Sequence, residues 1–390
     1  MTFEYYQKGG TLAEMKLMYI ANVRMPTEKA HGVAIAKSCE AFAEAGVATR
    51  LIVPWRRTPI KKTVFEAYGV KPVFRISFLP TLDLLSEKSG PIIFWLQALT
   101  FQMSLVLFLF FRSRKTILYT REAGFVPLRI MGYRVVLECH LIPRNRKTFF
   151  ALARRAHRII VISEAIKRAF LEEGFSEKNV LVAPSGVDLA VFDTDVSKAQ
   201  ARQELGFPAD VFVAVYTGNF TTMGADKGIS DIIKALPKAP GVLFVAVGGA
   251  QKDRGRYTQE AQDLNVLDRV VFRGTTTQRM LALYQKAADV LLMPFPDIPH
   301  YRDHMSPVKM FEYMAAKRPI IASDLPTIRE VLDENTAVLV PPGDEHALAQ
   351  ALRKAAEVRE ETRAEAAYQK VQQYAWGERT ARVLNHIRHG

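Results

Sequence analysis

The sequence predicts an α/β fold made of two Rossmann-like domains. Short apolar runs, typical of buried strands, alternate with segments of helical periodicity along the chain. The alternation occurs twice, over stretches of similar length, and it implies parallel sheets that helices cover on both faces. A length of 390 residues suits two domains of ordinary size.

The first half carries the first run of alternating elements. Strands are predicted at 17–21, 49–54, 74–79, 116–120, 134–138, 158–162 and 179–183. A helix is predicted at 33–45, ending at Gly46, and others at 147–157 and 164–173, besides a long apolar segment at 89–111. The boundary of this half is expected near 184–202, a stretch rich in Asp and small residues.

The second half repeats the pattern. Strands are predicted at 211–217, 242–247, 270–273, 290–293, 320–323 and 337–340, with helices near 228–235, 256–264, 277–287, 308–316 and 327–332. The tail from 345 to 389 is expected to be helical, with a break around 375–377. These elements predict a first domain over 1–185, a second over 186–375, and a C-terminal helix over 376–390 that packs back toward the first.

The net charge is concentrated in the first half. Residues 1–185 hold 28 Lys and Arg against 14 Asp and Glu, whereas residues 186–390 hold 25 against 26. A charge this one-sided suggests an anionic partner for the first domain, and a merely solubilising surface is the alternative. Two cysteines, Cys39 and Cys139, exclude a disulfide framework and favour a reducing compartment. The polar first residues show no secretory signal.

Residues 89–111 contain no charge and are long enough to cross a bilayer. Gln97, Thr100 and Ser104 share one side of the predicted helix, and strands are predicted on both sides of the segment. A helix of the first domain that is buried or touches a membrane is therefore favoured over a span or a re-entrant segment.

The densest chemical pattern lies at 304–332. Ser306 and Pro307 are typical of a helix start, with Ser306 as the N-cap, and the start offers free N–H groups to an anion such as a diphosphate. Glu312, about one and a half turns later, can accept hydrogen bonds from two adjacent hydroxyls. A plain helix start with an exposed glutamate is the alternative.

Three weaker patterns fall at loops that follow predicted strands. Gly218 and Asn219 come after the strand at 211–217, and Lys227 precedes the next helix as a point charge for phosphate. His140 ends the strand at 134–138, where a structural histidine is equally expected. Gly32 lies at the turn into the first helix and would let a ligand approach the backbone.

Together these segments resemble a known family. The hinge APSGVD at 183–188 with Phe192, the FRG at 272–274 and the run SPVKMFEYMAAKRPIIASDLPTIREVL at 306–332 carry the resemblance. They are similar to GT4-type retaining glycosyltransferases, whose GT-B fold has two Rossmann-like domains facing each other across a cleft, with C-terminal helices crossing back. The match is specific in the second half and looser in the first.

The resemblance implies a role for each matching residue. The second domain would bind a nucleotide-diphosphate sugar, such as a UDP- or GDP-sugar, as substrate, with no cofactor and no metal. The resemblance and the patterns above together predict these donor-binding residues: Gly32, Gly218, Asn219, Lys227, His304, Ser306, Pro307, Val308, Lys309 and Glu312. His140, near the donor sugar, and Lys227, at the diphosphate, would be the catalytic residues. The reaction would transfer a hexose or N-acetylhexosamine to an acceptor hydroxyl with retention, and the leaving diphosphate would help to deprotonate the acceptor.

Two positions depart from the family. His304 stands where the first glutamate of the E-x7-E motif is expected, and Asn219 stands where an arginine is common. They keep two alternatives open: a GT-B-like partner subunit with impaired catalysis, and a nucleotide-sugar 2-epimerase. A nucleic-acid binder is not supported, because no aromatic and basic interleaving occurs.

The basic first domain is expected to meet a glycan or lipid-linked acceptor of the cell envelope, such as lipopolysaccharide. This suggests a cytoplasmic protein that binds peripherally to the inner face of the cytoplasmic membrane. The segment with Lys147, Arg154, Arg155 and Arg158 around Phe149, Phe150 and Leu152 is the interfacial helix that this prediction proposes.

Overall fold

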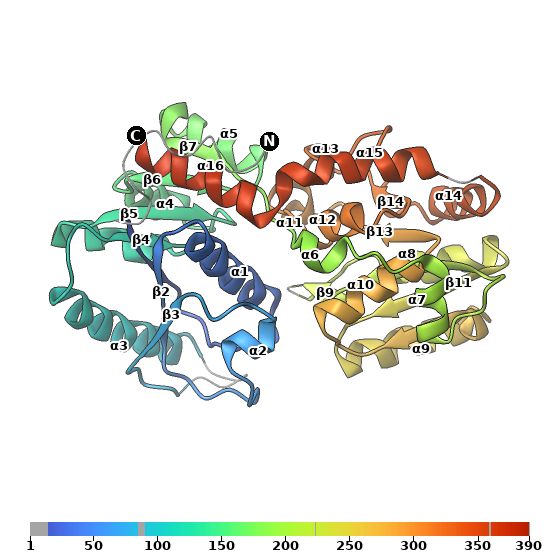
Figure 1. Cartoon of the computed structure of the whole chain (residues 1–390), viewed down its shortest axis with the longest axis horizontal. Helices are drawn as coiled ribbons and strands as arrows, with labels where there is room; N and C mark the ends of the chain where they lie inside the picture. Colours follow the sequence, from blue (N-terminus) through green and yellow to red (C-terminus); the bar gives the residue numbers. More distant parts are fainter. Residues whose placement is uncertain (1–14, 85–89, 223, 359, 390) are drawn as a thin grey trace. The chain divides into compact units, whose positions relative to one another are not determined.

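The computed structural model describes residues 15–84, 90–222, 224–358 and 360–389 (Figure 1). The chain divides into two compact units. The N-terminal unit holds the described residues up to Pro184 together with those from Trp376 onward, and the C-terminal unit runs from Ser185 to Ala375. The last helix therefore belongs to the unit formed by the first half of the sequence.

The N-terminal unit is built on a seven-stranded parallel sheet in the order β3-β2-β1-β4-β5-β6-β7. Its strands are β1 (Lys16–Ile20), β2 (Ala48–Pro54), β3 (Arg75–Leu79), β4 (Ile117–Thr120), β5 (Arg134–Cys139), β6 (Arg158–Val161) and β7 (Val180–Val182). The central strands are buried on both faces, which explains why they are continuous apolar runs.

Helices of the N-terminal unit cover both faces of this sheet. They are α1 (Ala30–Glu44), α2 (Val64–Tyr68), α3 (Pro91–Phe110), α4 (Arg146–Ala153), α5 (Glu164–Glu172) and α16 (Trp376–Arg388), with 3₁₀ turns η3 (Ala123–Met131) and η4 (Glu177–Asn179). Residues of α1 and α16 share one apolar core with the sheet, and residues of α3, α4 and α5 share the core of the opposite face.

The C-terminal unit has a six-stranded parallel sheet in the order β12-β11-β8-β13-β14-β15 and a small antiparallel pair, β9 and β10. The strands are β8 (Phe212–Thr217), β9 (Thr221–Thr222), β10 (Ala225–Asp226), β11 (Val242–Val247), β12 (Val270–Arg273), β13 (Val290–Met293), β14 (Ile320–Ser323) and β15 (Val338–Val340).

The helices of the C-terminal unit follow its strands in alternation. They are α6 (Leu189–Phe192), α7 (Lys198–Leu205), α8 (Ile229–Ala235), α9 (Gln251–Asp263), α10 (Gln278–Ala287), α11 (Pro299–Asp303), α12 (Val308–Ala315), α13 (Pro326–Arg329), α14 (Glu345–Glu357) and α15 (Glu361–Val371), with 3₁₀ turns η5 (Leu236–Lys238), η6 (Leu267–Arg269) and η7 (Gln372–Tyr374). Two apolar cores, one on each face of the sheet, hold the unit together.

The prediction that the segment around Phe149, Phe150 and Leu152 is an interfacial helix is wrong. In α4 the side chains of Phe149 and Phe150 are 8% and 1% exposed and pack in the core, against Phe170 of α5. Arg158 is buried in β6, where its guanidinium donates to the carbonyl of His386 at 3.1 Å. These aromatic side chains stabilise the fold, so they are not available to enter a membrane.

Candidate functional site

The candidate site of the C-terminal unit lies where the strand order reverses. β8 has β11 on one side and β13 on the other, and sheets of this kind bind ligands beyond the carboxyl ends of such strands. Gly218 follows β8 with a φ of 112°, a conformation that favours glycine. A Cβ on Gly248, which follows β11, would lie 2.3 Å from the Gly218 carbonyl oxygen, so these two loops touch.

The start of α12 is free of a side-chain cap. The sequence predicted Ser306 as its N-cap, which is wrong, because Pro307 takes that position. The Ser306 Oγ instead accepts a hydrogen bond from the Ser185 N–H at 2.8 Å, and the Ser185 hydroxyl donates to the Ser306 carbonyl at 2.7 Å. The N–H groups of Val308 and Lys309 in the first turn are therefore left for an anion.

The Lys309 side chain lies beside the glycine loop. A Cβ on Gly218 would be 3.5 Å from the Lys309 Nζ, and this Nζ is 3.3 Å from the centroid of the Tyr216 ring. The ammonium is buried and has no hydrogen-bond partner. Burial, and then the charge of Lys227, hold the pKa of Lys309 well below its usual value. A buried, unpaired ammonium is costly unless an anion joins it.

Lys227 lies next to the start of α8. Burial lowers the pKa of its ammonium to about 8. A Cβ on Gly228 would lie 1.8 Å from the Pro294 carbonyl oxygen, so only glycine fits this contact between the loop and β13's end. The Asp226 carboxylate accepts hydrogen bonds from the N–H groups of Gly228 at 2.5 Å and Ile229 at 2.8 Å. The amides at the start of α8 are thus occupied, and what this segment offers to an anion is the Lys227 side chain.

Glu312 is buried in the second turn of α12, with 8% of its surface exposed. Burial raises the pKa of its carboxyl to about 7, against the lowering effect of Lys309 and of a hydrogen bond from Gln285. The Gln285 Nε2 lies 3.4 Å from the Glu312 carboxylate and 3.1 Å from the Thr217 hydroxyl, which places the carboxylate near the end of β8. Such a weakly solvated carboxylate can accept hydrogen bonds from vicinal hydroxyls.

The two residues that depart from the family pattern are His304 and Asn219. His304 directly follows α11, and its Nδ1 lies 3.3 Å from the Pro299 carbonyl oxygen. The Asn219 side chain is exposed. His300, which the sequence patterns did not single out, has a buried Nδ1 without a hydrogen-bond partner. Burial, and then His304 and Lys227, lower its pKa. His300 lies one helical turn before His304, and this spacing was the signal that could have found it.

Arg254 lies beside the glycine-rich loops. Its guanidinium donates to the carbonyl of Gly249 at 2.7 Å, and a Cβ on Gly274 would be 3.7 Å from it. The C-terminal unit thus gathers Lys227, Lys309 and Arg254 around the ends of β8 and β11. Among the described residues the Lys309 ammonium has no partner, Arg254 donates to a carbonyl, and burial alone shifts the pKa of Lys227, so the site is suited to a multiply charged anion.

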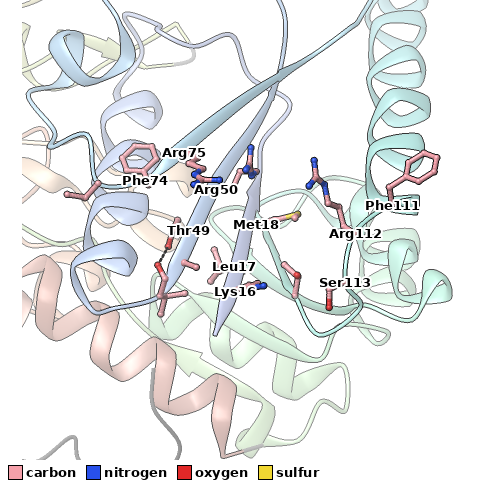
Figure 2. A pocket seen from close by; sticks show the side chains of 14 residues that line it. Lys16, Leu17, Met18, Thr49, Arg50, Phe74, Arg75, Phe111, Arg112 and Ser113 are labelled. Carbon is pink, nitrogen blue, oxygen red and sulfur yellow. Dashed lines mark hydrogen bonds between the residues drawn. The ribbon is translucent and has the colours of Figure 1, made fainter. Parts of the chain in front are cut away.

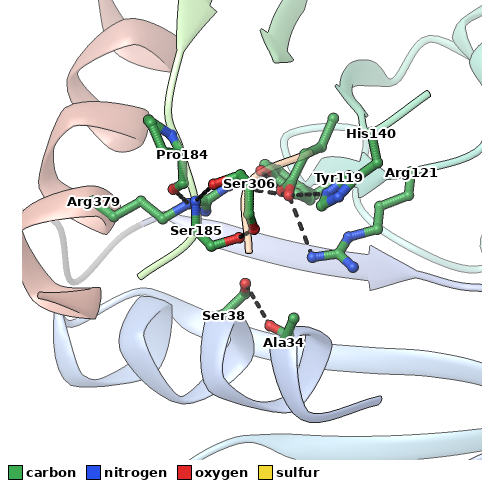
Figure 3. Close-up of polar contacts among 10 residues, drawn as sticks. Ala34, Ser38, Tyr119, Arg121, His140, Pro184, Ser185, Ser306 and Arg379 are labelled. Carbon is green, nitrogen blue, oxygen red and sulfur yellow. Dashed lines mark hydrogen bonds and ion pairs between the residues drawn. The ribbon is translucent and has the colours of Figure 1, made fainter. Parts of the chain in front are cut away.

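The N-terminal unit holds a buried polar cluster around Glu138 of β5 (Figure 3). The Glu138 carboxylate accepts hydrogen bonds from Tyr119, from Arg121 at 3.3 Å, from His140 at 2.6 Å and from Arg379 of α16 at 3.0 Å. Although burial acts in the opposite direction, these partners, Arg379 foremost, hold the pKa of Glu138 well below its usual value.

His140 is held by this cluster as a neutral imidazole. Burial lowers its pKa to about 4, even though the Glu138 carboxylate favours the charged form. Because a carboxylate only accepts hydrogen bonds, the His140 Nε2 carries the proton and the Nδ1 can accept one from a hydroxyl. His31 of α1 lies close enough that His140 contributes to lowering its pKa to about 4, after burial, Arg121 and Lys29.

Gly32 has a structural explanation that differs from the predicted one. A Cβ at this position would lie 2.2 Å from the Tyr68 hydroxyl oxygen. That hydroxyl accepts from the Thr27 N–H at 2.6 Å and donates to the Thr27 carbonyl at 2.9 Å. The space that the glycine leaves is therefore filled by Tyr68, and no ligand is needed to explain it.

The arrangement is that of an anion site joined to acceptors for hydroxyl groups. In the described parts of the chain, no group of three or more His, Cys, Asp or Glu side chains is placed to hold a metal ion. Cations and the uncapped amides of α12 gather at the end of β8. The Glu312 carboxylate lies one turn farther along α12. Phosphates at one end and a diol at the other would match this order of charges.

Comparison with known proteins relates part of the C-terminal unit to a known family. Residues 211–357 match the family model described as "Glycosyl transferases group 1". The chain is 34% identical over 163 residues to a D-inositol 3-phosphate glycosyltransferase of Mycobacteroides abscessus, covering 40% of this chain and 34% of that protein. It is 28% identical over 235 residues to a phosphatidyl-myo-inositol mannosyltransferase of Mycolicibacterium smegmatis, covering 58% and 55%. The chain thus matches about half or less of these relatives' length.

Solved structures match nearly the whole chain. A sucrose-phosphate synthase from Thermosynechococcus elongatus superposes with a TM-score of 0.77 at 21% identity, covering 95% of this chain and 98% of that one. The lipopolysaccharide outer core galactosyltransferase WaaB superposes with a TM-score of 0.68 at 14% identity, covering 96% and 99%. At these identities the likeness establishes the fold.

Proposed function

Because residues 211–357 match the model of the group 1 glycosyltransferases and the chain has the GT-B fold, we propose that it is a retaining, metal-independent glycosyltransferase. The proposed donor is a UDP- or GDP-linked hexose or N-acetylhexosamine. The proposed acceptor is a hydroxyl of a lipid-linked or cell-envelope glycan.

One observation carries the proposal: the unpaired Lys309 ammonium that is buried beside Gly218. It lies in the first turn of a helix whose own N–H groups are uncapped, and Lys227 is near enough to lower its pKa. A diphosphate supplies the negative charge that this cluster lacks, and Glu312 is the acceptor for the ribose hydroxyls of the same nucleotide. Asn219 stands where an arginine is common in the family, and Lys309 provides the second cation for the diphosphate in place of that arginine.

In the proposed reaction the protein positions the donor and stabilises the leaving group. Negative charge develops on the diphosphate as the glycosidic bond breaks, and Lys227, Lys309 and the α12 amides stabilise it. The diphosphate oxygen takes the acceptor proton on the same face of the sugar, which gives retention. His140 accepts a hydrogen bond from a sugar hydroxyl through its unprotonated Nδ1.

Names of relatives and the charge of the first half support the acceptor class. Phosphatidyl-myo-inositol in the name of one relative is a lipid, and teichuronic acid in that of a putative Bacillus subtilis relative is a cell-envelope polymer. Both are anionic, which matches the excess of 14 positive charges in residues 1–185. We therefore place the protein in the cytoplasm, peripherally bound at the inner face of the membrane.

The first experiment identifies the donor. Thermal unfolding is followed with UDP, GDP and their sugars, and a donor at a hundred times its dissociation constant adds about 2.7 kcal/mol to the free energy of unfolding. Transfer is then measured with radiolabelled sugar for the wild type, Lys227→Ala and Glu312→Ala. Each substitution is expected to lower the rate by roughly a hundredfold or more, the scale of losing one charge-stabilising group.

Lys234→Ala is the matched control, since Lys234 is an exposed lysine in the last turn of α8. It should transfer as the wild type does. Full activity of Lys227→Ala or Glu312→Ala would overturn the proposal. Nucleotide binding with neither hydrolysis nor transfer would assign the chain to a GT-B-like partner subunit instead, and release of an epimerised nucleotide sugar would assign it to the 2-epimerases.

A further inference from the structure

Helix α3 carries a stripe of polar side chains on its inner side, whereas its outward face is apolar. The Gln97 Nε2 donates to the Asn22 Oδ1 at 3.0 Å, Thr100 shares a hydrogen bond of 3.1 Å with Thr81, and the Ser104 hydroxyl donates to the Pro80 carbonyl at 2.7 Å. The outward face is apolar and exposed: Ile92, Phe94, Trp95, Leu96, Leu99, Met103, Val106, Leu107 and Phe110, followed by Phe111. This is the reverse of a helix on the surface of a soluble domain.

The same helix is fixed to the protein along its length. Phe101, Leu105 and Leu109 are fully buried in the apolar core of the sheet. By length and hydropathy Ile92–Phe110 is a candidate membrane span, with 22% of it buried. However, the strands before and after it, β3 and β4, belong to one parallel sheet. A spanning helix would put these two strands on opposite sides of a bilayer. Helix α3 is therefore a helix on the surface of the N-terminal unit and not a membrane span.

A cationic pocket adjoins the C-terminal end of α3 (Figure 2). The pocket has a volume of about 510 Å³, and its lining includes four cations: Lys16, Arg50, Arg75 and Arg112. The exposed Phe111 also lines it. No carboxylate of the described residues lines it. Burial, and then the charges of Arg112 and Arg75, lower the pKa of Arg50, which shows that the guanidinium groups act on one another.

We propose that the N-terminal unit docks on an anionic bilayer through the exposed apolar face of α3, with a lipid phosphate in the pocket lined by Lys16, Arg50, Arg75 and Arg112. The cations beside this apolar face pair with no carboxylate among the described residues, and such a surface is complementary to acyl chains next to anionic headgroups. A second copy of the chain is less suitable, because its first half carries the same excess of positive charge and would be repelled. The proposal rests on the peripheral membrane binding of the proposed function and names the surface that carries it, whereas docking itself requires no sugar transfer.

Docking through α3 also brings the edge of the sheet that carries His140 to the membrane. The hydrogen bond from Gln97 to Asn22 ties the N-terminal part of α3 to the residues that follow β1. The sheet is parallel, so β1 and β5 end at the same edge, and His140 follows β5 there. A helix lying in the headgroup region would hold this edge next to lipid-linked acceptors.

The test is co-sedimentation of the full chain with vesicles, without any sugar donor. Vesicles of phosphatidylcholine alone are compared with vesicles of phosphatidylcholine and phosphatidylglycerol in equal amounts. Leu99→Glu with Leu107→Glu charges the exposed face, and we expect binding to both vesicles to fall at least tenfold. The matched control is Leu267→Glu with Val358→Glu, two exposed apolar side chains of the C-terminal unit, and it should bind as the wild type does.

A second pair of variants tests the pocket. Arg75→Gln with Arg112→Gln removes two cations, each worth about fivefold near an anionic surface, so affinity for the anionic vesicles should fall about thirtyfold. Binding to phosphatidylcholine alone, whose phosphate is balanced by its own choline group, should change little. Arg279→Gln with Arg353→Gln, two exposed arginines of the C-terminal unit, is the control and should have no effect.

Three results would overturn the proposal: no vesicle binding by the wild type, wild-type binding by both variant pairs, or a dimer in lipid-free solution that the Leu99→Glu and Leu107→Glu pair dissociates. The last would assign the face of α3 to a second copy. Leu99→Ser with Leu107→Ser is the milder variant should the charged pair fail to fold. Nucleotide binding of these variants, measured in solution, should equal that of the wild type, which separates failure of docking from failure of the proposed function.

Discussion

Replacing Lys309 by methionine tests the anion site most directly. Methionine keeps the length of the side chain and its contact with Tyr216, but it removes the buried ammonium. Removing an unsatisfied buried donor relieves about 1–3 kcal/mol. The lost cation–π contact, worth about 2 kcal/mol when desolvated, offsets most of that gain. The ligand-free variant should therefore be as stable as the wild type, or more stable by about 1 kcal/mol.

Nucleotide binding should respond in the opposite direction. A hydrogen bond between an ammonium and a phosphate contributes about 1.5–3 kcal/mol, so Lys309→Met should weaken binding of the cognate nucleoside diphosphate by roughly 10- to 150-fold. Isothermal calorimetry gives the dissociation constant, and urea unfolding without ligand gives the stability.

Lys317 provides the matched control for this substitution. Its ammonium also lies over a tyrosine ring, 3.8 Å from the Tyr368 centroid, but it pairs with Asp193 at 2.9 Å. Lys317→Met should leave nucleotide binding unchanged and lower stability by at most about 1 kcal/mol. The reasoning fails if Lys309→Met binds nucleotide within twofold of the wild type, or if it loses 2 kcal/mol or more of stability without ligand.

Three further predictions follow from contacts described above. Because Lys227 has a pKa lowered to about 8, it loses its proton as pH rises above 8, and calorimetry should show nucleotide affinity falling by up to about tenfold per pH unit there; a flat profile from pH 7 to 10 would contradict this. Arg379→Met leaves the buried Glu138 short of its main partner and should cost about 3–5 kcal/mol in urea unfolding, whereas a loss below 1 kcal/mol would show that the cluster re-pairs. Gly228→Ala places a Cβ 1.8 Å from the Pro294 carbonyl at a φ of 89°, and it should lower the free energy of unfolding by about 2 kcal/mol or more, a value that an unchanged melting temperature would refute.

The strands were predictable because each is a short apolar run buried in a parallel sheet. All thirteen strands of the two large sheets occur within one or two residues of the predicted ranges. Helix starts were less predictable, since amphipathic patterns weaken at polar ends. Helix α9 begins at Gln251 rather than 256. Helix α14 ends at Glu357 and α15 begins at Glu361, where one continuous helix was expected.

The candidate site shows where sequence reasoning ends. Spacing along the chain predicted a helix start at Pro307, but it did not reveal that Ser306 bonds to Ser185, or that the Lys309 side chain reaches back to the glycine loop. Those contacts depend on which loops meet beyond the sheet. The same holds for α3: the stripe of Gln97, Thr100 and Ser104 was recognised, but only the structure shows that it is the inner side.

The ion pair between Glu138 and Arg379 joins residues 241 positions apart in the chain. During synthesis at about 5–20 residues per second, the carboxylate emerges roughly 10 to 50 s before its guanidinium partner. During that time the sheet of the N-terminal unit lacks α16 and the apolar side chains that α16 adds to the core. Although its strands come first on the ribosome, this unit is the one completed last, and in that interval its uncovered face is exposed to chaperones and proteases.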